Sequence, residues 1–409
     1  MLATVTAPAP EKAPARGLRR PRPLLVAWGI VVLANAVAQP IRAARDLVDT
    51  DYVYAFMTAG RMLHQGTSCL YCRDMVRNAR AGFLQTGTAL QNDLFSNPPL
   101  AAWVIQPIAL LPVGISFAVF LALSIAAIVA AGVILTTRIL PEDVPIATRG
   151  VLVFLALTTL PAMQALALVN WNGILVLAVA GSAWAAIARR PVLAGALISV
   201  LLVKPQTVWL VPVVLLITLN WRPLVGFALG AATWLISTLL LIGPGQLPAW
   251  AHNDLPAHSP EVHQTVGLPG IVAEVAGSSA AGFGSAVILS VIAAVAAWRL
   301  REALRADLAA TIGLAVAASI LCSPHIWPED MLLVAVPLML WARWEILPAL
   351  ALTGGLSVAY VLDSALPLGG GHLEALVLAG VVTGLVRCVV RVHSGTLSAR
   401  GAIPGLIAA

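Results

Sequence analysis

The chain has 409 residues, of which 60% are hydrophobic and only 10% are charged, and its mean hydropathy is +0.92. Soluble domains are roughly half apolar and a quarter charged, so this composition excludes a soluble globular protein. The formal net charge is +6. The arginines stand at the ends of apolar runs and not along one face, which indicates membrane topology and excludes a nucleic-acid partner. The sequence therefore predicts an all-α, polytopic integral membrane protein.

The first 23 residues are basic and rich in Pro and Ala, which predicts a disordered cytoplasmic tail over 1–23. The apolar run that follows begins late and has no small-residue cleavage pattern before charge resumes. We therefore interpret it as an uncleaved first span and not as a signal peptide. Residues 24–392 are expected to form one membrane domain, and residues 393–409 a second cytoplasmic tail.

Apolar runs continue along the chain, and a bilayer core needs about 20 residues for each helix. We expect about twelve spans on this basis. They are placed at 24–41, 114–137, 148–168, 172–188, 191–203, 205–219, 222–243, 284–299, 308–322, 328–342, 344–362 and 372–391. With the N-terminal tail inside, the arginines between these runs all fall on the inner side, as short cytoplasmic loops require. Two long loops, 42–97 and 244–283, are left on the outer side.

This topology holds only if segment 98–112 does not cross the membrane. An additional crossing there would place every later pair of arginines on the outer side. The segment is short for a full span and contains internal prolines. We therefore interpret it as a re-entrant or interfacial helix.

The first outer loop begins with three acidic residues close together, Asp46, Asp49 and Asp51. From Asp51 onward the apolar residues have helical spacing, which predicts an amphipathic helix on the membrane surface. A carboxylate near the N-terminus of that helix is either a general base or metal ligand, or it merely caps the helix. The loop alone does not decide between these interpretations.

Several polar residues stand at predicted span ends on the same outer side. They are Asn170, Asn172, Lys204, Gln206, His258, His263, His325, Glu329 and Asp330. A lysine between two apolar segments is costly in hydrocarbon, so Lys204 is expected to face a cavity or a partner, with snorkelling to the interface as the alternative. For His325 the alternative is an interfacial histidine bonded to backbone. Trp171, Trp250 and Trp327 are interpreted as aromatic residues of the interface belt.

Cys69 and Cys72 form a C-L-Y-C pair in the first outer loop. Two cysteines are too few for a structural zinc site, which has four ligands. Outside the cytoplasm the pair forms either a local disulfide or two free thiols. The sequence contains no Gly-rich phosphate loop, no Walker lysine motif and no Ser-His-Asp signature, so nucleotide hydrolysis is not supported.

Four longer stretches carry motifs of a known family. They are DYVYAFMTAGRMLHQG at 51–66, NPPLAAWVIQPIALLP at 97–112, RPVLAGALISVLLVKPQ at 190–206 and SPHIWPEDMLLVAVP at 323–337. In motif, order and spacing they resemble family 87 of the glycosyltransferases, membrane enzymes of the GT-C superfamily that use a polyprenyl-phosphate sugar. The chain departs from that pattern at Asn97, where the family has an aromatic residue, and at Asn170, where it often has Gln.

The resemblance implies a GT-C-like enzyme that moves a sugar from a lipid phosphate to an acceptor hydroxyl on the extracytoplasmic face, with inversion at the anomeric carbon. The attacking hydroxyl needs a carboxylate to take its proton, and Asp51 is our choice, with Asp49 as its neighbour or substitute. The leaving phosphate needs only a cation, which Lys204 is expected to supply with His325 as a second donor. Substrate contacts are expected from Asn172, Gln206, His258 and His263.

The resembling family consists mostly of mannosyltransferases, with some arabinofuranosyltransferases, so the expected donor is polyprenyl-phosphate mannose. The expected acceptor is a glycolipid or polysaccharide, and the expected location is the plasma membrane. No cofactor is expected, although a divalent cation at Asp49 and Asp51 stays open. The main alternative is a secondary transporter, whose polar residues would lie near mid-membrane. A passive assembly scaffold is the third interpretation, and it predicts that Asp51 and Lys204 are replaceable without loss.

Overall fold

The computed structural model describes residues 23–45, 47, 50–67, 69–84, 95–257, 262, 265–365 and 371–397. Every regular element within these residues is a helix, which confirms the all-α fold class. Most of the two expected tails lies outside the described residues. Three of the expected site residues, Asp49, His258 and His263, also lie outside them.

In the described part of the chain, five helical segments are long and apolar enough to cross a membrane. They are α5 (Val113–Ile134) with its continuation η3 (Leu135–Ile139), α11 (Trp221–Leu241), α14 (Ser279–Arg299), α18 (Ile346–Ala365) and α19 (His372–His393). Between 17% and 39% of the residues in their most apolar windows are buried. These helices therefore present apolar side chains outward, as a helix facing lipid does.

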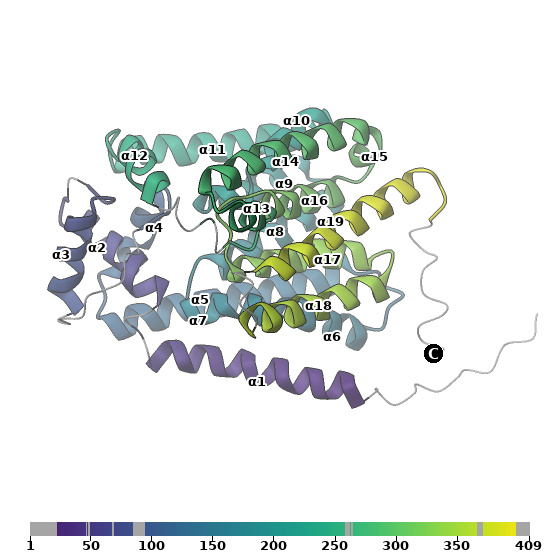
Figure 1. Cartoon of the computed structure of the whole chain (residues 1–409), viewed down its shortest axis with the longest axis horizontal. Coiled ribbons are helices and arrows are strands. Elements are labelled where there is room, and N and C mark those ends of the chain that lie inside the picture. Colours follow the sequence, from purple (N-terminus) through teal and green to yellow (C-terminus); the bar gives the residue numbers. More distant parts are fainter. Residues whose placement is uncertain are drawn as a thin grey trace, which may run out of the picture.

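The centre of the bundle is built from shorter helices, which Figure 1 shows between the longer ones. They include α8 (Asn172–Ile187), α16 (Leu308–Leu321) and α17 (Ala335–Ala342). All of α17 is buried, and it continues a 3₁₀ helix, η7 (Pro328–Val334). At rises of 2.0 and 1.5 Å per residue, η7 and α17 together reach about 26 Å, close to the ~30 Å of a hydrocarbon core.

Helices lie at all twelve expected span positions. Only five of them, or six if a bent pair counts as one, are long and apolar enough by themselves. Besides α8, α16, η7 and α17, the shorter or unscored elements at these positions are α1 (Pro23–Arg45), α9 (Pro191–Ile198), η4 (Ser199–Val203), η5 (Pro205–Thr207) and α10 (Leu210–Ile217). The number of crossings and the side of each loop therefore stay predictions.

The expected span 148–168 is not one straight helix. It divides into α6 (Ile146–Leu157) and α7 (Leu160–Leu168), which are bent by 65° relative to each other. Pro161 occupies the first turn of α7. A proline disfavours the helical conformation in the residue before it, so the chain leaves the helix just upstream and starts again in a new direction.

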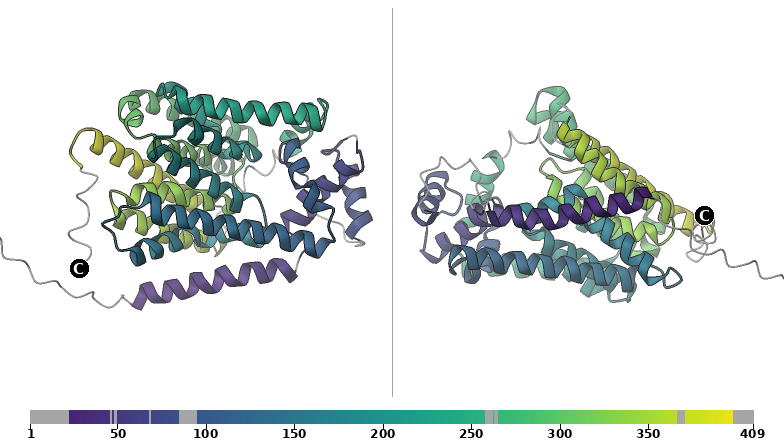
Figure 2. Two further views of the ribbon diagram at one scale, coloured as in Figure 1. Left: turned by 180° about the vertical axis from the view of Figure 1, so that it is seen from behind. Right: turned by 90° about the horizontal axis from the view of Figure 1, so that it is seen from below.

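Four helices gather at one end of the bundle, whereas α19 ends at the opposite end (Figures 1 and 2). They are α2 (Thr58–His64), α3 (Arg73–Leu84), α4 (Pro99–Ala109) and α12 (Gln246–Ala257). With 11 residues, α4 is well below the about 20 that a span needs. Other short helices stand at expected spans, so the non-crossing of segment 98–112 stays a prediction.

The segment after Asp51 does not lie on the surface, so that prediction is wrong. It forms one π-helical turn, η2 (Tyr52–Met57), in which every residue except Tyr54 is buried. The Tyr52 ring stacks on Phe120 of α5 with a centroid distance of 4.7 Å. The run from Tyr52 to Met57 is apolar on all sides, and such a helix is buried on all sides.

Candidate functional site

The Asp51 side chain does not cap the helix that it precedes. Asp51 stands at the N-cap of η2 without a side-chain capping hydrogen bond, and the Thr50 hydroxyl accepts from the Val53 N–H instead, at 3.4 Å. The Asp51 carboxylate accepts a hydrogen bond from the Tyr54 hydroxyl at 2.8 Å and a longer one from the Asn170 amide at 3.4 Å. Asp51 is partly exposed. Both the partners and the exposure favour a site residue over a structural cap.

Lys204 lies in the turn between η4 and η5 and is removed from water, with 8% of its surface exposed. Its ammonium forms an ion pair with Asp330 at 2.7 Å, and the Glu329 carboxylate lies 3.8 Å away. Both carboxylates are also buried. Snorkelling to the interface is therefore excluded for Lys204, because its charge is satisfied inside the protein.

Electrostatics connects these two groups of residues. Burial alone would lower the pKa of the Lys204 ammonium, but the negative charges of Asp330 and Glu329, with a smaller contribution from Asp51, outweigh burial and raise its pKa. Lys204 is therefore charged at neutral pH. Asp51 contributes to this shift, so its carboxylate lies within electrostatic range of the buried lysine.

The site is assembled from segments far apart in the sequence. Asn170 follows α7, Lys204 follows η4, and Asp330 belongs to η7. The Asp330 carboxylate also accepts from the Trp327 N–H at 3.1 Å, which fixes the start of η7. Each polar residue therefore stands at an end or break of a helix, where irregular backbone requires polar partners.

Asn97 secures the segment before Lys204. Its buried side-chain amide donates to the Val203 backbone carbonyl at 2.7 Å, and its backbone carbonyl accepts from the Tyr71 hydroxyl at 2.8 Å. The aromatic residue of the family pattern would not make the first of these bonds. Sequence reasoning noted Asn97 only as a departure, yet it connects the outer helices to the Lys204 turn.

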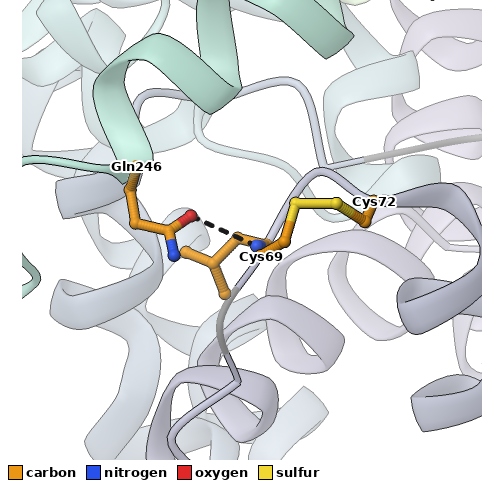
Figure 3. Close-up of a disulfide and its surroundings, with 4 residues drawn as sticks. Cys69, Cys72 and Gln246 are labelled. Atoms are coloured by element: carbon orange, nitrogen blue, oxygen red, sulfur yellow. Dashed lines mark hydrogen bonds between the residues drawn. A yellow bond between two sulfur atoms is a disulfide. The ribbon is translucent and has the colours of Figure 1, made fainter.

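Cys69 and Cys72, which follow α2, are joined in a disulfide (Figure 3). Between them, the Leu70 N–H donates to the Gln246 side chain of α12 at 3.2 Å. This bond joins the loop after α2 to a segment more than 170 residues later in the chain. Of the two alternatives left open by the sequence, the structure has the disulfide.

The other expected site residues differ in their surroundings. Asn172 is fully buried, and neither its amide nitrogen nor its amide oxygen has a hydrogen-bond partner among the described residues. Gln206 is half-buried in η5, two residues after Lys204. His325 is half-buried with its ring edge-on to Trp327 at 5.9 Å.

Two further residues, Tyr54 and Arg80, belong to the surroundings of Asp51, and the sequence did not indicate either of them. Tyr54 donates to Asp51, and Arg80 of α3 donates to the Tyr54 carbonyl at 2.8 Å while its guanidinium lies 5.2 Å from the centre of the Tyr54 ring. Arg80 is 3% exposed. Nothing in the local sequence distinguishes Arg80 from the other arginines of α3, so its burial is visible only in the structure.

Trp171 is not an interface-belt residue, so that prediction is wrong. The side chain is 4% exposed and packs against Phe56 and Phe120, with ring centroids at 5.9 and 5.4 Å. Its indole N–H is buried and has no partner within the described residues. Trp171 stands between Asn170 and Asn172. Packed aromatic rings and hydrogen-bonding groups without a partner in the described residues therefore lie next to Asn170, which donates to Asp51.

A family model described as Glycosyltransferase family 87 matches residues 95–324, more than half of the chain. The chain belongs to glycosyltransferase family 87. As a family 87 member it is a membrane glycosyltransferase. No curated protein and no solved structure matches it.

The matched region of this family 87 protein contains Asn170 and Lys204 but neither Asp51 nor Asp330. The structure adds these two acids by folding the N-terminal segment and η7 against the matched region. No three His, Cys, Asp or Glu side chains within the described residues come together as metal ligands. Asp49 lies outside those residues, so a cation at Asp49 and Asp51 stays untested.

Proposed function

We propose that this family 87 glycosyltransferase transfers a sugar, which we take to be mannose, from a polyprenyl-phosphate donor to a hydroxyl of a glycolipid or polysaccharide acceptor. The observation that carries the proposal is the Asp51 carboxylate, which is partly exposed, not used as a helix cap, and oriented by Tyr54 and Asn170. A positioned carboxylate of this kind is what a hydroxyl nucleophile requires.

The proposed step balances as a single displacement. The acceptor oxygen forms a bond to the anomeric carbon on the face opposite the phosphate, and its proton passes to Asp51. The bond between the anomeric carbon and the phosphate oxygen breaks, and the electron pair leaves with the polyprenyl phosphate. The leaving group is already a stable anion, so no general acid is needed, and the reaction inverts the anomeric configuration.

Lys204 has a structural role in this proposal. Its ammonium already forms the 2.7 Å ion pair with Asp330. A phosphate would have to compete with that carboxylate, so we assign to Lys204 the attachment of η7 to the turn between η4 and η5. Phosphate binding by Lys204 or His325 stays a prediction.

We place the site on the extracytoplasmic face of the plasma membrane. The support is the Cys69–Cys72 disulfide, because disulfides persist in oxidising compartments. Accessibility labelling of introduced cysteines should find residues 60–95 and 250–275 outside and residues 189, 301 and 391 inside. Labelling of residues 60–95 and residue 189 from the same side would mean that segment 98–112 spans, and would overturn this placement.

The proposed activity is tested with purified protein in proteoliposomes that contain radiolabelled polyprenyl-phosphate mannose and a glycolipid acceptor. Label should move to the acceptor with wild-type protein and not with Asp51→Asn. Asp74→Asn is the matched control, because Asp74 is an exposed carboxylate of the neighbouring helix α3. Equal transfer by wild type and Asp51→Asn would refute the assignment of the base.

A further inference from the structure

A cavity lined by both charged and apolar side chains lies at the end of the bundle opposite α2, α3 and α4. It has a volume of about 320 Å³ and lies where α14 ends at Arg299, α15 (Arg301–Ala306) begins, and α19 ends at His393. Figure 1 shows α15 and the last turn of α19 on that side of the molecule. Two membrane-crossing helices end here, so the cavity lies at the height of the lipid headgroups.

Two cations of this cavity are held on one exposed aromatic ring. The guanidinium groups of Arg299 and Arg301 lie 5.4 and 5.5 Å from the ring centre of Trp298, which is 51% exposed. Within the described part of the chain, neither arginine forms an ion pair with a carboxylate. The indole positions both guanidinium groups and leaves their N–H groups available to an anion.

Other arginines near the same end are used differently. Arg343 pairs with Asp307 at 3.2 Å, and Arg391 pairs with Glu345 at 2.9 Å. These pairs neutralise charge within the protein. Among the described residues, Arg299 and Arg301 form no such pair, and both lie on the Trp298 ring that lines the cavity.

The charge of the cavity suits one phosphodiester. Its lining carries two positive charges, from Arg299 and Arg301, and one negative charge, from Glu302, which gives a net charge of +1 with His393 neutral. A ligand with a single negative charge balances this lining. A second negative charge would face Glu302.

An apolar surface leads from the cavity along the membrane. Val287, Val291 and Val295 of α14 follow one another at helical spacing before Trp298, and they are 64%, 57% and 51% exposed. Residues four apart share one face of a helix, so this stripe is continuous with the cavity. A ligand that fills both regions has a singly charged phosphate and long apolar chains.

We propose that this cavity binds the headgroup of an anionic phospholipid, a phosphatidylglycerol-type lipid, with its acyl chains on the α14 stripe. Arg299 and Arg301 donate hydrogen bonds to the phosphate, as arginine pairs do in phosphate recognition. Basic pockets at the ends of membrane helices bind anionic headgroups by the same chemistry. This lipid site is remote from the Asp51 site and does not depend on the proposed transferase chemistry.

The test compares lipid binding by the purified full-length protein with native mass spectrometry. Wild type should retain phosphatidylglycerol at least about tenfold better than phosphatidylcholine, and the double variant Arg299→Gln/Arg301→Gln should lose that preference. The matched control is Arg222→Gln, because Arg222 is an exposed arginine beside the exposed Trp221 at the start of α11. Equal retention of both lipids by wild type, or an unchanged preference in the double variant, overturns the proposal.

Two further measurements test whether the site binds the whole lipid and not only an anion, and whether the lipid binds at this cavity. Glycerol phosphate should compete at least about tenfold more weakly than the intact lipid, and equal competition would show a bare anion site and overturn the lipid assignment. Brominated phosphatidylglycerol should quench tryptophan fluorescence more in wild type than in Trp298→Phe. If the quenching is unchanged in Trp298→Phe, the lipid does not bind at this cavity and the proposal is wrong.

Discussion

Ion pairs occur at both ends of the helical bundle, but they differ in how far they are removed from water. The Lys204–Asp330 pair has side-chain exposures of 10% and 0%, whereas the Arg391–Glu345 pair has 35% and 21%. An exposed pair contributes about 0–1 kcal/mol, because water screens it and two long side chains must be ordered. A buried pair must repay the desolvation of two charges, so it is weak evidence for stability by itself.

Stability alone therefore does not explain the buried cluster of Lys204, Asp330 and Glu329, which favours a functional interpretation. Hydrophobic residues of similar volume would fill the same space at no greater cost. The cluster lies within electrostatic range of Asp51, the carboxylate that is oriented without capping its helix. The partly exposed pairs at the other end are explained by helix ends and loop charge alone.

The largest effect is expected from Asp51→Asn. The amide keeps the size of the carboxylate and can still accept from Tyr54, but it cannot take the acceptor proton. General-base catalysis is typically worth about a hundred- to ten-thousandfold, so turnover in proteoliposomes should fall at least about a hundredfold. The thermal unfolding temperature should be nearly unchanged. A loss of turnover below about threefold would mean that another carboxylate is the base. The functional interpretation of the buried cluster near Asp51 would then be wrong.

The second effect is on stability, with Lys204→Met. Removal of the cation leaves the Asp330 and Glu329 carboxylates buried without a positive partner, which typically costs about 3–5 kcal/mol. Thermal unfolding in detergent measures this loss. The double variant Lys204→Met/Asp330→Asn should recover part of it, and a double variant less stable than the single one would contradict the ion-pair account.

The stability due to Lys204 also depends on pH in a defined direction. The folded-state pKa of Lys204 is raised above its ordinary value of 10.5. A raised pKa gives stability that is fully present below the unfolded-state pKa and is lost as the pH rises through the folded-state value. Lys204 should therefore stay charged between pH 6 and 9, and wild type should remain more stable than Lys204→Met throughout that range. A difference that disappears within that range would show that Lys204 is not a charged partner there.

Tyr54→Phe tests how the Asp51 carboxylate is positioned. A hydrogen bond to a carboxylate stabilises the charged form, so its removal raises the pKa of Asp51. The acidic limb of the pH–rate profile should move to higher pH, and turnover near neutrality should fall roughly tenfold, since such bonds are worth about 1.5–3 kcal/mol. Tyr360→Phe is the control, because the Tyr360 hydroxyl accepts from Gln164. A fall in turnover without a pH shift would indicate a packing role only.

The smallest effect is expected from Arg391→Gln, which removes the partly exposed pair with Glu345. The free energy of unfolding should change by about 0–1 kcal/mol, and sugar transfer should be unaffected. The same unfolding measurement as for Lys204→Met makes the two ends directly comparable. Equal losses at both positions would mean that burial does not distinguish the two pairs.

Much of the architecture follows from local properties of the chain. The lengths of the apolar runs predict a helical membrane protein, because hydrocarbon requires backbone hydrogen bonds to close within each segment. The motif around Asp51 and the isolated Lys204 were both recognisable, because a charge next to an apolar run is unusual. These inferences depend only on residues within a few turns of each other.

The partners of these residues were not predictable in the same way. Asn170 is 119 residues from Asp51, and Asp330 is 126 residues from Lys204. No periodicity along the chain shows that two such residues meet, since their contact depends on how the helices between them pack. Trp171 and Arg80 show the same limit, because burial of a side chain is decided by its neighbours in space.

The sequence by itself determined that the chain is helical, that it belongs in a membrane, and which charged residues are unusual there. Only the tertiary structure decided that Asp51 is not a cap, that Lys204 is paired with Asp330, and that short central helices are extended by 3₁₀ turns. Hydrophobicity and helical period act over a few residues. Ion pairs and hydrogen bonds form between whichever polar groups the packed helices bring within about 3 Å of each other.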